Sequence, residues 1–546
     1  MAVLIVPPLD LSFPTLGPAL ADFIEDRCIF GPGSLAGLPA KLDDEKLAAL
    51  YRIYEVYPRG HRLAGRRRFQ RAAIEWRKGL AKTEFAAWIM FCELHPEAPV
   101  RCDGFDARKN PVGKPVAHPY IPMLAHTQEQ VAELAYGVLK YVVDEGPDSA
   151  LFDSSLERII RLGPNGRADG RAVPVANAPG SRDGALTTCQ HADEPHRLYL
   201  PSHKAAHETM SANLSKRAME DPWMLYTSTA GQPGQNSIQE DVRLEAEMIE
   251  RGEIKDPALF FFARWAGPEH DDLSTIEKRI SAISDATGPA GEYGPGQFET
   301  IAKQWDRPKA DTAYLERVWL NRWRKSNSMA FDLIKVGGLC TPAQVIPDGA
   351  FITLGFDGAR FRDATGIVAT DILTGRQQLL AGWERPADVE DWEINESEVT
   401  ASLEDAMTRF DVWKMYGDPP HWTETMGSWS VRWPDQIEEW WTARPKVMAY
   451  TIREYLEAID ANSISFGGLD TQHDDLIRHI GNAGRKDLRL RDDEGKPLWV
   501  LQKQNGHEEL KFDYAMASVL SWKACTDARK AGAQPKQKSR APRRIY

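Results

Sequence analysis

The chain has 546 residues, enough for two or three domains at roughly 100–200 residues each. Its 42% apolar and 27% charged residues indicate a globular protein, and the absence of an apolar run of about 18 residues argues against a membrane-spanning one. The net charge of −12 argues against a general nucleic-acid coat, although a local basic groove stays compatible with it.

Cysteine usage and the amino-terminal sequence bear on the cellular compartment. The six cysteines show neither a CxxC pair nor the spacing of a metal site, which predicts reduced thiols in a cytosolic protein. The first 20 residues are apolar but interrupted by prolines, and they lack the basic start of a signal peptide.

Residues 71–94 are expected to form a strand, a short basic loop and a helix. An apolar run is followed by the loop RKGLAK and then by a helix that Thr83 opens and that is dense in apolar side chains. This layout is typical of a phosphate-binding P-loop, in which backbone N–H groups at the helix start cradle the phosphates. Lys82 would reach the β- and γ-phosphates, and the Thr83 hydroxyl would bind Mg²⁺.

The match to the P-loop pattern G-x-x-x-x-G-K-[ST] is incomplete. The eight aligned residues are WRKGLAKT, so Trp76 and Ala81 stand where the pattern has glycine, and Gly79 lies inside the loop instead. On this stretch alone, a basic loop that binds no nucleotide is an equally weighted alternative.

A second strand–helix unit and an acidic pair follow. Residues 120–125 are a predicted strand, and Thr127 caps a helix that runs to about residue 143. Residues 184–199 contain a strand that ends in Asp193 and Glu194. In an ATPase, Asp193 would hold Mg²⁺ through water and Glu194 would act as general base toward the attacking water. A surface-exposed acidic pair is the alternative.

Three hydroxyl side chains follow the next buried strand. A helix over residues 202–219 leads to a strand over residues 223–226, which ends in Thr227, Ser228 and Thr229. At the carboxyl end of a strand, where α/β sheets bind ligands, these hydroxyls could sense the γ-phosphate. The alternative is a polar turn.

The remaining first-half segments carry weaker signals. Residues 1–45 are predicted to be irregular, 43–57 helical, 163–183 a loop or irregular hairpin and 235–335 mostly helical. The turn-rich residues 342–350 are the expected linker between domains.

The second half begins with a predicted hairpin. Residues 351–357 form an apolar strand that ends in Asp357, and residues 365–373 form the strand that follows the turn. Residues 412–418 are another short strand, and it ends in Asp418. Further predicted elements are helices at 398–409, 471–483 and 512–524 and strands at 446–450 and 498–502, with a basic disordered tail from residue 527.

Three carboxylates of this half are candidates for a shared metal site. Asp357 and Asp418 end strands, and Asp513 lies in the first turn of a helix with an apolar body. Converging carboxylates repel one another unless cations offset their charge, and hard oxygen ligands select Mg²⁺ or Mn²⁺. Two such ions roughly 3.5–4 Å apart stabilise both oxygens of phosphodiester hydrolysis. Because acidic residues are abundant, a chance selection of three is the alternative.

From about residue 45 to residue 522, the chain resembles the large terminase subunit of tailed bacteriophages, most closely the versions in phages of actinobacteria. The motifs that carry the resemblance are WRKGLAKT, YIPMLAHTQEQ, HADEPH and YTSTAG in the first half and LGFDGARFRDATGIVA, YGDPPHW, HDDLIRHIGNA and KFDYAMASVLSW in the second. The second set is the more specific.

The resemblance implies an α/β protein with an N-terminal P-loop (ASCE-type) ATPase domain built on a parallel sheet and a C-terminal RNase H-like α/β nuclease domain. The expected divisions are an irregular segment 1–45, the ATPase domain 46–340, the nuclease domain 341–525 and a basic disordered tail 526–546.

The family's site residues map onto named positions. Those expected to contact ATP and its Mg²⁺ are Arg77, Lys78, Gly79, Ala81, Lys82, Thr83 and Asp193, with Glu194 as catalytic base and Thr227, Ser228 and Thr229 as coupling residues. The nuclease metal ligands, for Mg²⁺ or Mn²⁺, are expected at Asp357, Asp418 and Asp513. Other branches place the third acid in an HDDL helix, which makes Asp475 and Asp474 its competitors, with His473 and Asn482 as supporting residues or structural ones.

The implied function is ATP-driven translocation of viral double-stranded DNA into the procapsid, with metal-dependent endonuclease cleavage of concatemeric DNA. The implied partners are DNA, the portal protein, the small terminase subunit and further copies in a homo-oligomeric ring. The implied location is the host cytoplasm, on the procapsid during packaging and not in the mature virion. Alternatives are a helicase-like or repair ATPase fused to a nuclease without a capsid, and a scaffold protein with a decayed P-loop.

Overall fold

The computed structural model describes residues 2–124, 135–175, 184–289, 297–307, 310–324, 329–361, 363–385, 392–503 and 510–535. The chain divides into two units, Met1–Lys325 and Ser326–Tyr546. This division precedes the expected domain boundary at residues 340–341, because α11 (Leu333–Gly338) contacts α14 (Pro445–Asp460) and β12 (Cys340–Pro342) pairs with β18 (Ser465–Gly468) within the second unit.

A nine-stranded sheet organises the described part of the first unit, in the order β1-β11-β2-β10-β9-β5-β8-β7-β6. Its strands are β1 (Ala2–Val6), β2 (Arg71–Glu75), β5 (Tyr120–Leu124), β6 (Phe152–Ser154), β7 (Ile159–Leu162), β8 (Ala168–Val175), β9 (Cys189–Asp193), β10 (Trp223–Ser228) and β11 (Leu259–Trp265). The central strands β11, β2, β10, β9, β5 and β8 run parallel. The carboxyl ends of β2, β10 and β9 therefore meet at one edge, where ligands of such sheets bind.

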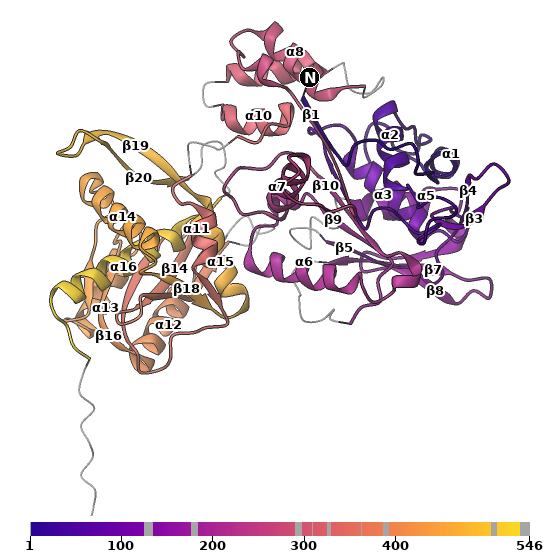
Figure 1. Ribbon diagram of the computed structural model, residues 1–546. Helices are drawn as coiled ribbons and strands as arrows, with labels where there is room; N and C mark the ends of the chain where they lie inside the picture. The colour runs from indigo at the N-terminus through magenta and orange to yellow at the C-terminus, as the bar shows by residue number, and fades with distance from the viewer. Residues whose placement is uncertain are drawn as a thin grey trace, which may run out of the picture. The chain divides into compact units, whose positions relative to one another are not determined.

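Helices pack against this sheet, and a separate helical group lies beyond one end of it (Figure 1). The helices are α1 (Gly17–Arg27), α2 (Asp44–Ile53), α3 (Lys82–Leu94), α5 (Ala135–Glu145), α6 (Pro201–Asn213), α7 (Ile238–Glu250), α8 (Ile276–Thr287), α9 (Phe298–Ala302) and α10 (Thr312–Leu320), and a separate hairpin pairs β3 (Arg101–Phe105) with β4 (Pro111–Lys114). Of these, α8 and α10 belong to the separate helical group. Helix α3 is buried along nearly its whole length in the larger core cluster, as its dense apolar sequence predicts.

Several predictions about the first unit need correction. The first 45 residues are not irregular: they add β1, which pairs antiparallel with β11, and α1. The region 235–335, predicted to be mostly helical, also contains a buried strand, β11, with the sequence LFFFARW. A continuous apolar run of this length suits a strand covered on both faces, and local periodicity does not distinguish it from a buried helix. The predicted helix cap Thr127 lies outside the described residues.

The second unit has an RNase H-like sheet. Its order is β12-β18-β15-β14-β13-β16-β17, in which β13 (Phe351–Gly358), β14 (Ala364–Asp371) and β15 (Arg376–Glu384) form an antiparallel meander. On the other side of β13, β16 (Asp411–Gly417) and β17 (Ile437–Glu439) run parallel. Together the two units confirm the predicted fold class.

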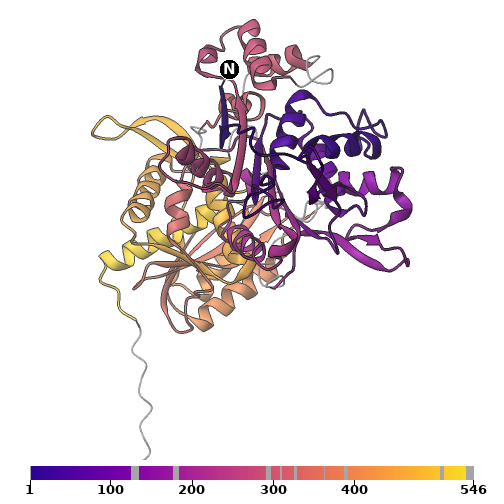
Figure 2. The same cartoon turned by 45° about the vertical axis from the view of Figure 1, so that its right-hand side comes forward.

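The helices of the second unit are α11, α12 (Glu396–Arg409), α13 (Thr423–Arg432), α14, α15 (Asp470–Asn482) and α16 (Asp513–Lys530). Helix α16 packs along β13 and β14. The antiparallel strands β19 (Ala483–Arg491) and β20 (Pro497–Lys503) form a long ribbon that extends away from the rest of this unit in both views (Figures 1 and 2).

Two predicted elements of this unit are wrong. Residues 446–450 belong to α14 and not to a strand, because Met448, Ile452, Tyr455 and Ile459 recur at helical spacing and form one buried face. The tail predicted from residue 526 is helical in its first part, since α16 continues to Lys530. Residues 536–546 lie outside the described part.

No helix within the described ranges is long and apolar enough to cross a membrane. All six cysteines are free thiols, as their spacing predicts.

The contact between β13 and α16 is close enough to require glycine at position 355. A Cβ there would lie 1.9 Å from the carbonyl oxygen of Ala517 and 2.5 Å from the backbone nitrogen of Ser521. Gly355→Ala should lower the free energy of unfolding of the second unit by about 1–3 kcal/mol or more, since the backbone of α16 must move. Urea unfolding of the full chain measures this.

Gly427→Ala is the matched control, because Gly427 is exposed inside α13 and a Cβ there has open space. It should raise the unfolding free energy by roughly 0.5–1 kcal/mol through helix propensity. Equal stability of the two variants would contradict the proposed close packing.

Candidate functional site

The predicted P-loop has left-handed backbone at the second glycine position of its sequence pattern. Strand β2 ends at Glu75, and α3 begins at Lys82. Between them Gly79 (φ 84°) and Ala81 (φ 53°) are left-handed. Ala81 occupies the second glycine position of the pattern, so the loop keeps the glycine-like path at a residue for which it costs about 1–2 kcal/mol. Such strain is concentrated at ligand-binding loops.

Lys82 faces the acidic strand end across the edge of the sheet. Its Nζ lies 3.9 Å from Oε1 of Glu194 and 3.3 Å from the carbonyl oxygen of Arg77. Burial lowers the pKa of Lys82, and the charge of Glu194 opposes this shift. Burial alone would raise the pKa of Glu194, but Lys82 and the hydrogen bond with His196 lower it well below its usual range. Glu194 is therefore ionised at neutral pH.

Asp193 and Glu194 titrate in opposite directions although they are adjacent. Burial, and then the charge of Glu194, raises the pKa of Asp193 to about 7. Its Oδ2 accepts a hydrogen bond from the backbone N–H of Ala135 at 3.1 Å, and its Oδ1 lies 3.4 Å from Oγ1 of Thr227. Because a cation favours the carboxylate form, this buried acid suits a position next to Mg²⁺.

The three hydroxyl residues at the end of β10 and directly after it contact the acidic pair, Thr227 and Thr229 directly and Ser228 through His196. The backbone N–H of Thr229 donates to Oε2 of Glu194 at 3.2 Å, and its Oγ1 donates to the same oxygen at 3.3 Å. Ser228 Oγ lies 3.0 Å from Nδ1 of His196, which lies 3.0 Å from Glu194 Oε2. The register pairs Thr227 with Asp193. These residues can therefore report on the position of the Glu194 carboxylate.

Of the other residues predicted to contact ATP, Arg77 and Lys78 bind the helices that follow β11. The Arg77 guanidinium is 2% exposed and donates to Thr287 Oγ1 on α8 at 2.6 Å, so it is bound to the helical segment that follows β11. The N–H of Lys78 donates to the carbonyl of Val318 on α10 at 2.8 Å. Thr83 is half-buried in the first turn of α3. The roles of these residues toward ATP stay predictions.

In the second unit, the two strand-end acids are neighbours. Asp357 lies near the end of β13, and Asp418 directly follows β16, which runs parallel beside it. The N–H of Asp418 donates to the carbonyl of Phe356 at 3.1 Å. The N–H of Thr442 donates to Asp418 Oδ1 at 3.1 Å, and its hydroxyl donates to Oδ2. The convergence expected from the sheet therefore occurs.

The third acid approaches the same strand pair from helix α16. Oδ2 of Asp513 lies 3.4 Å from the N–H of Ala364, the first residue of β14. Burial, followed by the charges of Asp513, Asp418 and Asp363, raises the pKa of Asp357 well above its usual value. Burial and then the charge of Asp363 raise the pKa of Asp513 to about 6. The carboxylates thus share one electrostatic environment, and divalent cations would relieve it.

Asp363 is a fourth carboxylate of this group that the sequence interpretation did not single out. It lies in the turn between β13 and β14 and pairs with Lys503 on β20. The sequence signal for Asp363 is its position in the same hairpin as Asp357, because a hairpin turn brings the end of one strand close to the start of the next. Lys503 offsets part of its charge.

Asp474 and Asp475, the competing acids of the HDDL helix, have their own partners on that helix. Asp475 forms an ion pair with Arg478 at 2.8 Å, and Asp474 lies 3.7 Å from Nδ1 of His473. His473 is buried, and Asn482 donates to the carbonyl of Lys511 at 3.0 Å. The charges that act on Asp357 are those of Asp513, Asp418 and Asp363.

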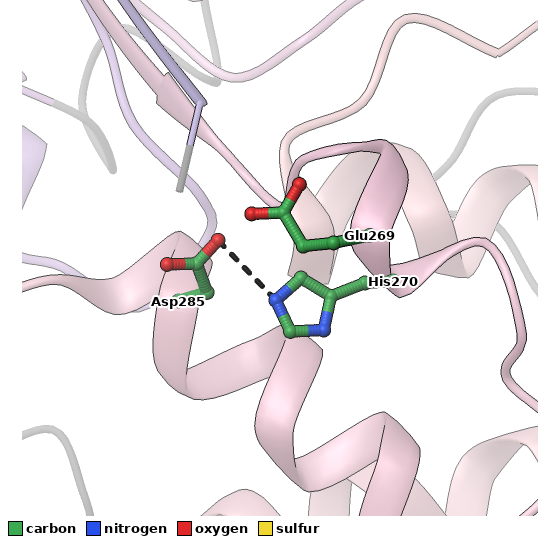
Figure 3. Close-up of side chains that lie close together, drawn as sticks. All are labelled: Glu269, His270 and Asp285. Carbon is green, nitrogen blue, oxygen red and sulfur yellow. Dashed lines mark ion pairs between the residues drawn. The ribbon is translucent and has the colours of Figure 1, made fainter.

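One further group could ligate a metal ion within the described ranges. Glu269, His270 and Asp285 each offer a ligand atom, and these atoms lie within 4.8 Å of one another. The Nε2 of His270 lies 3.4 Å from Oδ2 of Asp285 on α8 (Figure 3). The predicted metal ligands Asp357, Asp418 and Asp513 are not among this group, and a two-metal centre, as predicted for them, would share its ligands between two ions.

Comparison with known proteins gives one curated relative and a set of solved structures. The chain is 23% identical over 523 residues to the Gene 13 protein of Mycobacterium phage L5, and the match covers 89% of this chain and 84% of that protein. No family model matches.

Three of the matched structures are phage terminases or a domain of one. The large terminase of bacteriophage HK97 matches 93% of this chain and 100% of its own, with 15% identity and a TM-score of 0.41. The large terminase of a thermophilic bacteriophage, in complex with ADP, matches 87% and 98%, with 11% identity and a TM-score of 0.34. The large terminase nuclease of the thermophilic phage G20c with bound magnesium matches 36% and 97%, with 12% identity and a TM-score of 0.28.

Metal binding at Asp357, Asp418 and Asp513 should release protons. Because the pKa of Asp513 is raised to about 6 and that of Asp357 lies well above its usual value, a bound cation must displace protons at about pH 6 and below. The affinity for Mn²⁺ should therefore fall as the pH falls through about 6. Calorimetric titrations in two buffers of different ionisation enthalpy measure the protons released.

Asp513→Asn should reduce this proton release, whereas Asp487→Asn, at an exposed position on β19, should not. Proton release that is the same in both variants would place Mn²⁺ at another site.

Proposed function

We propose that this protein is a large terminase subunit, an ATP-driven motor that moves viral double-stranded DNA into a procapsid and cuts concatemeric DNA with a metal-dependent nuclease. The observation that carries the proposal is the presence of two separate acidic centres in one chain. One is paired with a P-loop lysine, and the other is a cluster of carboxylates on an RNase H-like sheet.

The first centre fits ATP hydrolysis. Left-handed backbone at Gly79 and Ala81 and the start of α3 offer N–H groups to phosphates, and Lys82 supplies the cation. Asp193 would hold Mg²⁺, which offsets charge on the β- and γ-phosphates. Once the phosphates attract Lys82, Glu194 keeps only its contacts with His196 and Thr229, and its carboxylate can accept a proton from the water that attacks the γ-phosphate. Thr229 then holds the Glu194 carboxylate in place.

The second centre fits phosphodiester hydrolysis. Asp357, Asp418 and Asp513 would hold Mg²⁺ or Mn²⁺, and two ions at this type of site stabilise the attacking and leaving oxygens. Burial raises the pKa values of all three acids, and the charges of Asp513 and Asp418 add to it at Asp357, which is the electrostatic setting in which a cation binds most favourably.

Similarity to a mycobacteriophage protein over most of both chains favours a phage protein over a repair ATPase fused to a nuclease. The proposal includes the partners of a packaging motor: the portal protein, the small terminase subunit and further copies of this chain in a ring on the procapsid in the host cytoplasm. The decisive experiment is DNA packaging: purified portal-bearing procapsids, this protein and ATP should protect double-stranded DNA from added nuclease. ATPase and nuclease activities without such protection would favour the repair enzyme.

Lys82→Ala should abolish ATP hydrolysis, because the ammonium group offsets phosphate charge that is otherwise unpaired. Glu194→Gln should retain ATP binding and slow hydrolysis by about 10²–10⁴-fold, the usual contribution of a general base. Phosphate release and equilibrium binding of a fluorescent ATP analogue measure the two effects.

Lys114→Ala, at an exposed lysine on β4 of the same unit, is the matched control and should leave turnover unchanged. Parent-like turnover in Lys82→Ala would remove the P-loop assignment.

Asp513→Asn should reduce metal-dependent plasmid cleavage as deeply as Asp357→Asn does, with the ATPase rate intact, because both acids belong to the same charge cluster. Asp475→Asn and Asp474→Asn should have smaller effects, since Asp475 is paired with Arg478. Plasmid nicking with Mg²⁺ or Mn²⁺ measures this. An inactive Asp475→Asn together with an active Asp513→Asn would move the third ligand to α15.

A further inference from the structure

We propose that His479 is a positioning residue for the nuclease centre, which fixes the start of α16 so that Asp513 faces Asp357 and Asp418. This inference rests on the proposed nuclease function. It assigns to α15, the helix of the HDDL motif, the task of holding the third acid.

The ring nitrogens of His479 each have one partner, and the partners define the tautomer. Nδ1 lies 3.2 Å from the backbone nitrogen of Tyr514, which can only donate, so Nδ1 accepts. Nε2 lies 2.9 Å from Oε1 of Glu384, so Nε2 carries the hydrogen and donates to the carboxylate. The His479 side chain is completely buried. A neutral imidazole with this tautomer satisfies both contacts.

The hydrogen bond to Tyr514 determines where Asp513 lies. The first N–H groups of a helix have no partner within the helix, and His479 supplies one to the residue next to Asp513. Helix α16 has no side-chain cap at its start, where Phe512 is the N-cap residue. The imidazole of α15 therefore takes over this function from another helix.

The Tyr514 ring is also held from both sides. It stacks on the His479 ring with a centroid distance of 3.7 Å and an interplanar angle of 6°. Glycines on two strands leave room for it: a Cβ at Gly366 would lie 2.5 Å from its Cδ1, and a Cβ at Gly382 would lie 2.6 Å from its hydroxyl oxygen. A ring enclosed in this way cannot rotate without moving α15 or the sheet, so the first turn of α16 is rigid.

Charged partners hold the other end of the imidazole. Glu384 on β15 accepts a hydrogen bond from Nε2 of His479 and forms an ion pair with Arg478. The Nζ of Lys511 lies 3.9 Å from Oε2 of Glu384. Arg478 also binds Asp475 at 2.8 Å. Asp475 is thus linked to His479 through Arg478 and Glu384, which gives this acid of α15 a structural role although Asp513 supplies the carboxylate.

The test uses full-length variants that separate hydrogen bonding from packing. His479→Leu keeps most of the side-chain volume but cannot accept the Tyr514 N–H. His479→Asn places Oδ1 where Nδ1 lies and retains the acceptor. Tyr455→Phe is the matched control, because the Tyr455 hydroxyl lies 2.9 Å from Ser518 Oγ, further along α16, and is equally buried.

The measurements are the Mn²⁺ concentration for half-maximal plasmid nicking, Mn²⁺ binding by electron paramagnetic resonance, the ATPase rate and thermal unfolding. His479→Leu should weaken Mn²⁺ affinity roughly 10–100-fold, the usual effect of removing a group that orients a metal ligand. The ATPase rate should not change. His479→Asn should recover most of the affinity, and Tyr455→Phe should lose stability without a change in Mn²⁺ dependence.

Unchanged Mn²⁺ dependence in His479→Leu, or an equal change in Tyr455→Phe, would overturn the proposal and leave His479 a structural residue. If His479→Leu does not fold, His479→Gln takes its place, because a Gln side chain puts its carbonyl oxygen near the position of Nε2 and cannot accept the Tyr514 N–H. His479→Gln should then weaken Mn²⁺ affinity where His479→Asn does not, and equal affinities of the two variants would overturn the proposal. Parent protein that binds Mn²⁺ but never nicks DNA would refute the nuclease function alone, and Mn²⁺ binding by the variants would still test the positioning role.

Discussion

Like-charged carboxylates that meet at the edge of a sheet are the constraint on which both units depend. Parallel strands bring their carboxyl ends to one edge, and in each unit acidic residues lie there. Two carboxylates in a partly buried site repel each other. A cation, a bound proton or several hydrogen-bond donors must offset this repulsion. The two units resolve this repulsion in different ways, and the difference corresponds to the two proposed chemistries.

In the first unit a lysine of the chain itself supplies the cation. Lys82 lies beside Glu194, which remains ionised, while Asp193 lies deeper and holds its proton up to about pH 7. Neighbouring acids whose pKa values are moved apart divide the tasks of base and metal ligand. A buried side chain stabilises this arrangement: Asn321 donates to the carbonyls of Glu75 and Arg264 and accepts from the N–H of Ala230. It therefore joins the ends of β2, β11 and β10 around the P-loop.

In the second unit, lysines near the acids offset only part of their charge. Lys503 pairs with Asp363, and Lys511 lies beside Glu384. Asp357 and Asp513 consequently have raised pKa values and suit externally supplied divalent ions. Metal binding at such a site depends on how firmly each carboxylate is held, because ligands that move lose affinity. The contacts of His479 with Tyr514 and Glu384 are the means by which the fold holds the acid that does not come from a strand.

The order of elements and the residue types at their ends follow from local sequence. Strong local signals, such as the strand, basic loop and helix of residues 71–94 and the acids that follow two apolar runs, are encoded within a few residues, and the structure contains those elements. A short apolar run without such flanking residues does not show whether it forms a strand or a helix. The buried strand β11 and the helical residues 446–450 both differ from the sequence prediction, because only burial by distant segments distinguishes a strand from a helix there. Which side chains meet depends instead on long-range packing. Three contacts show this: Lys82 pairs with Glu194, Asp363 lies among the acids, and His479 binds the start of α16. These contacts join residues that are far apart in the sequence or on two sides of a turn. They depend on strand register and helix packing, which no local pattern specifies.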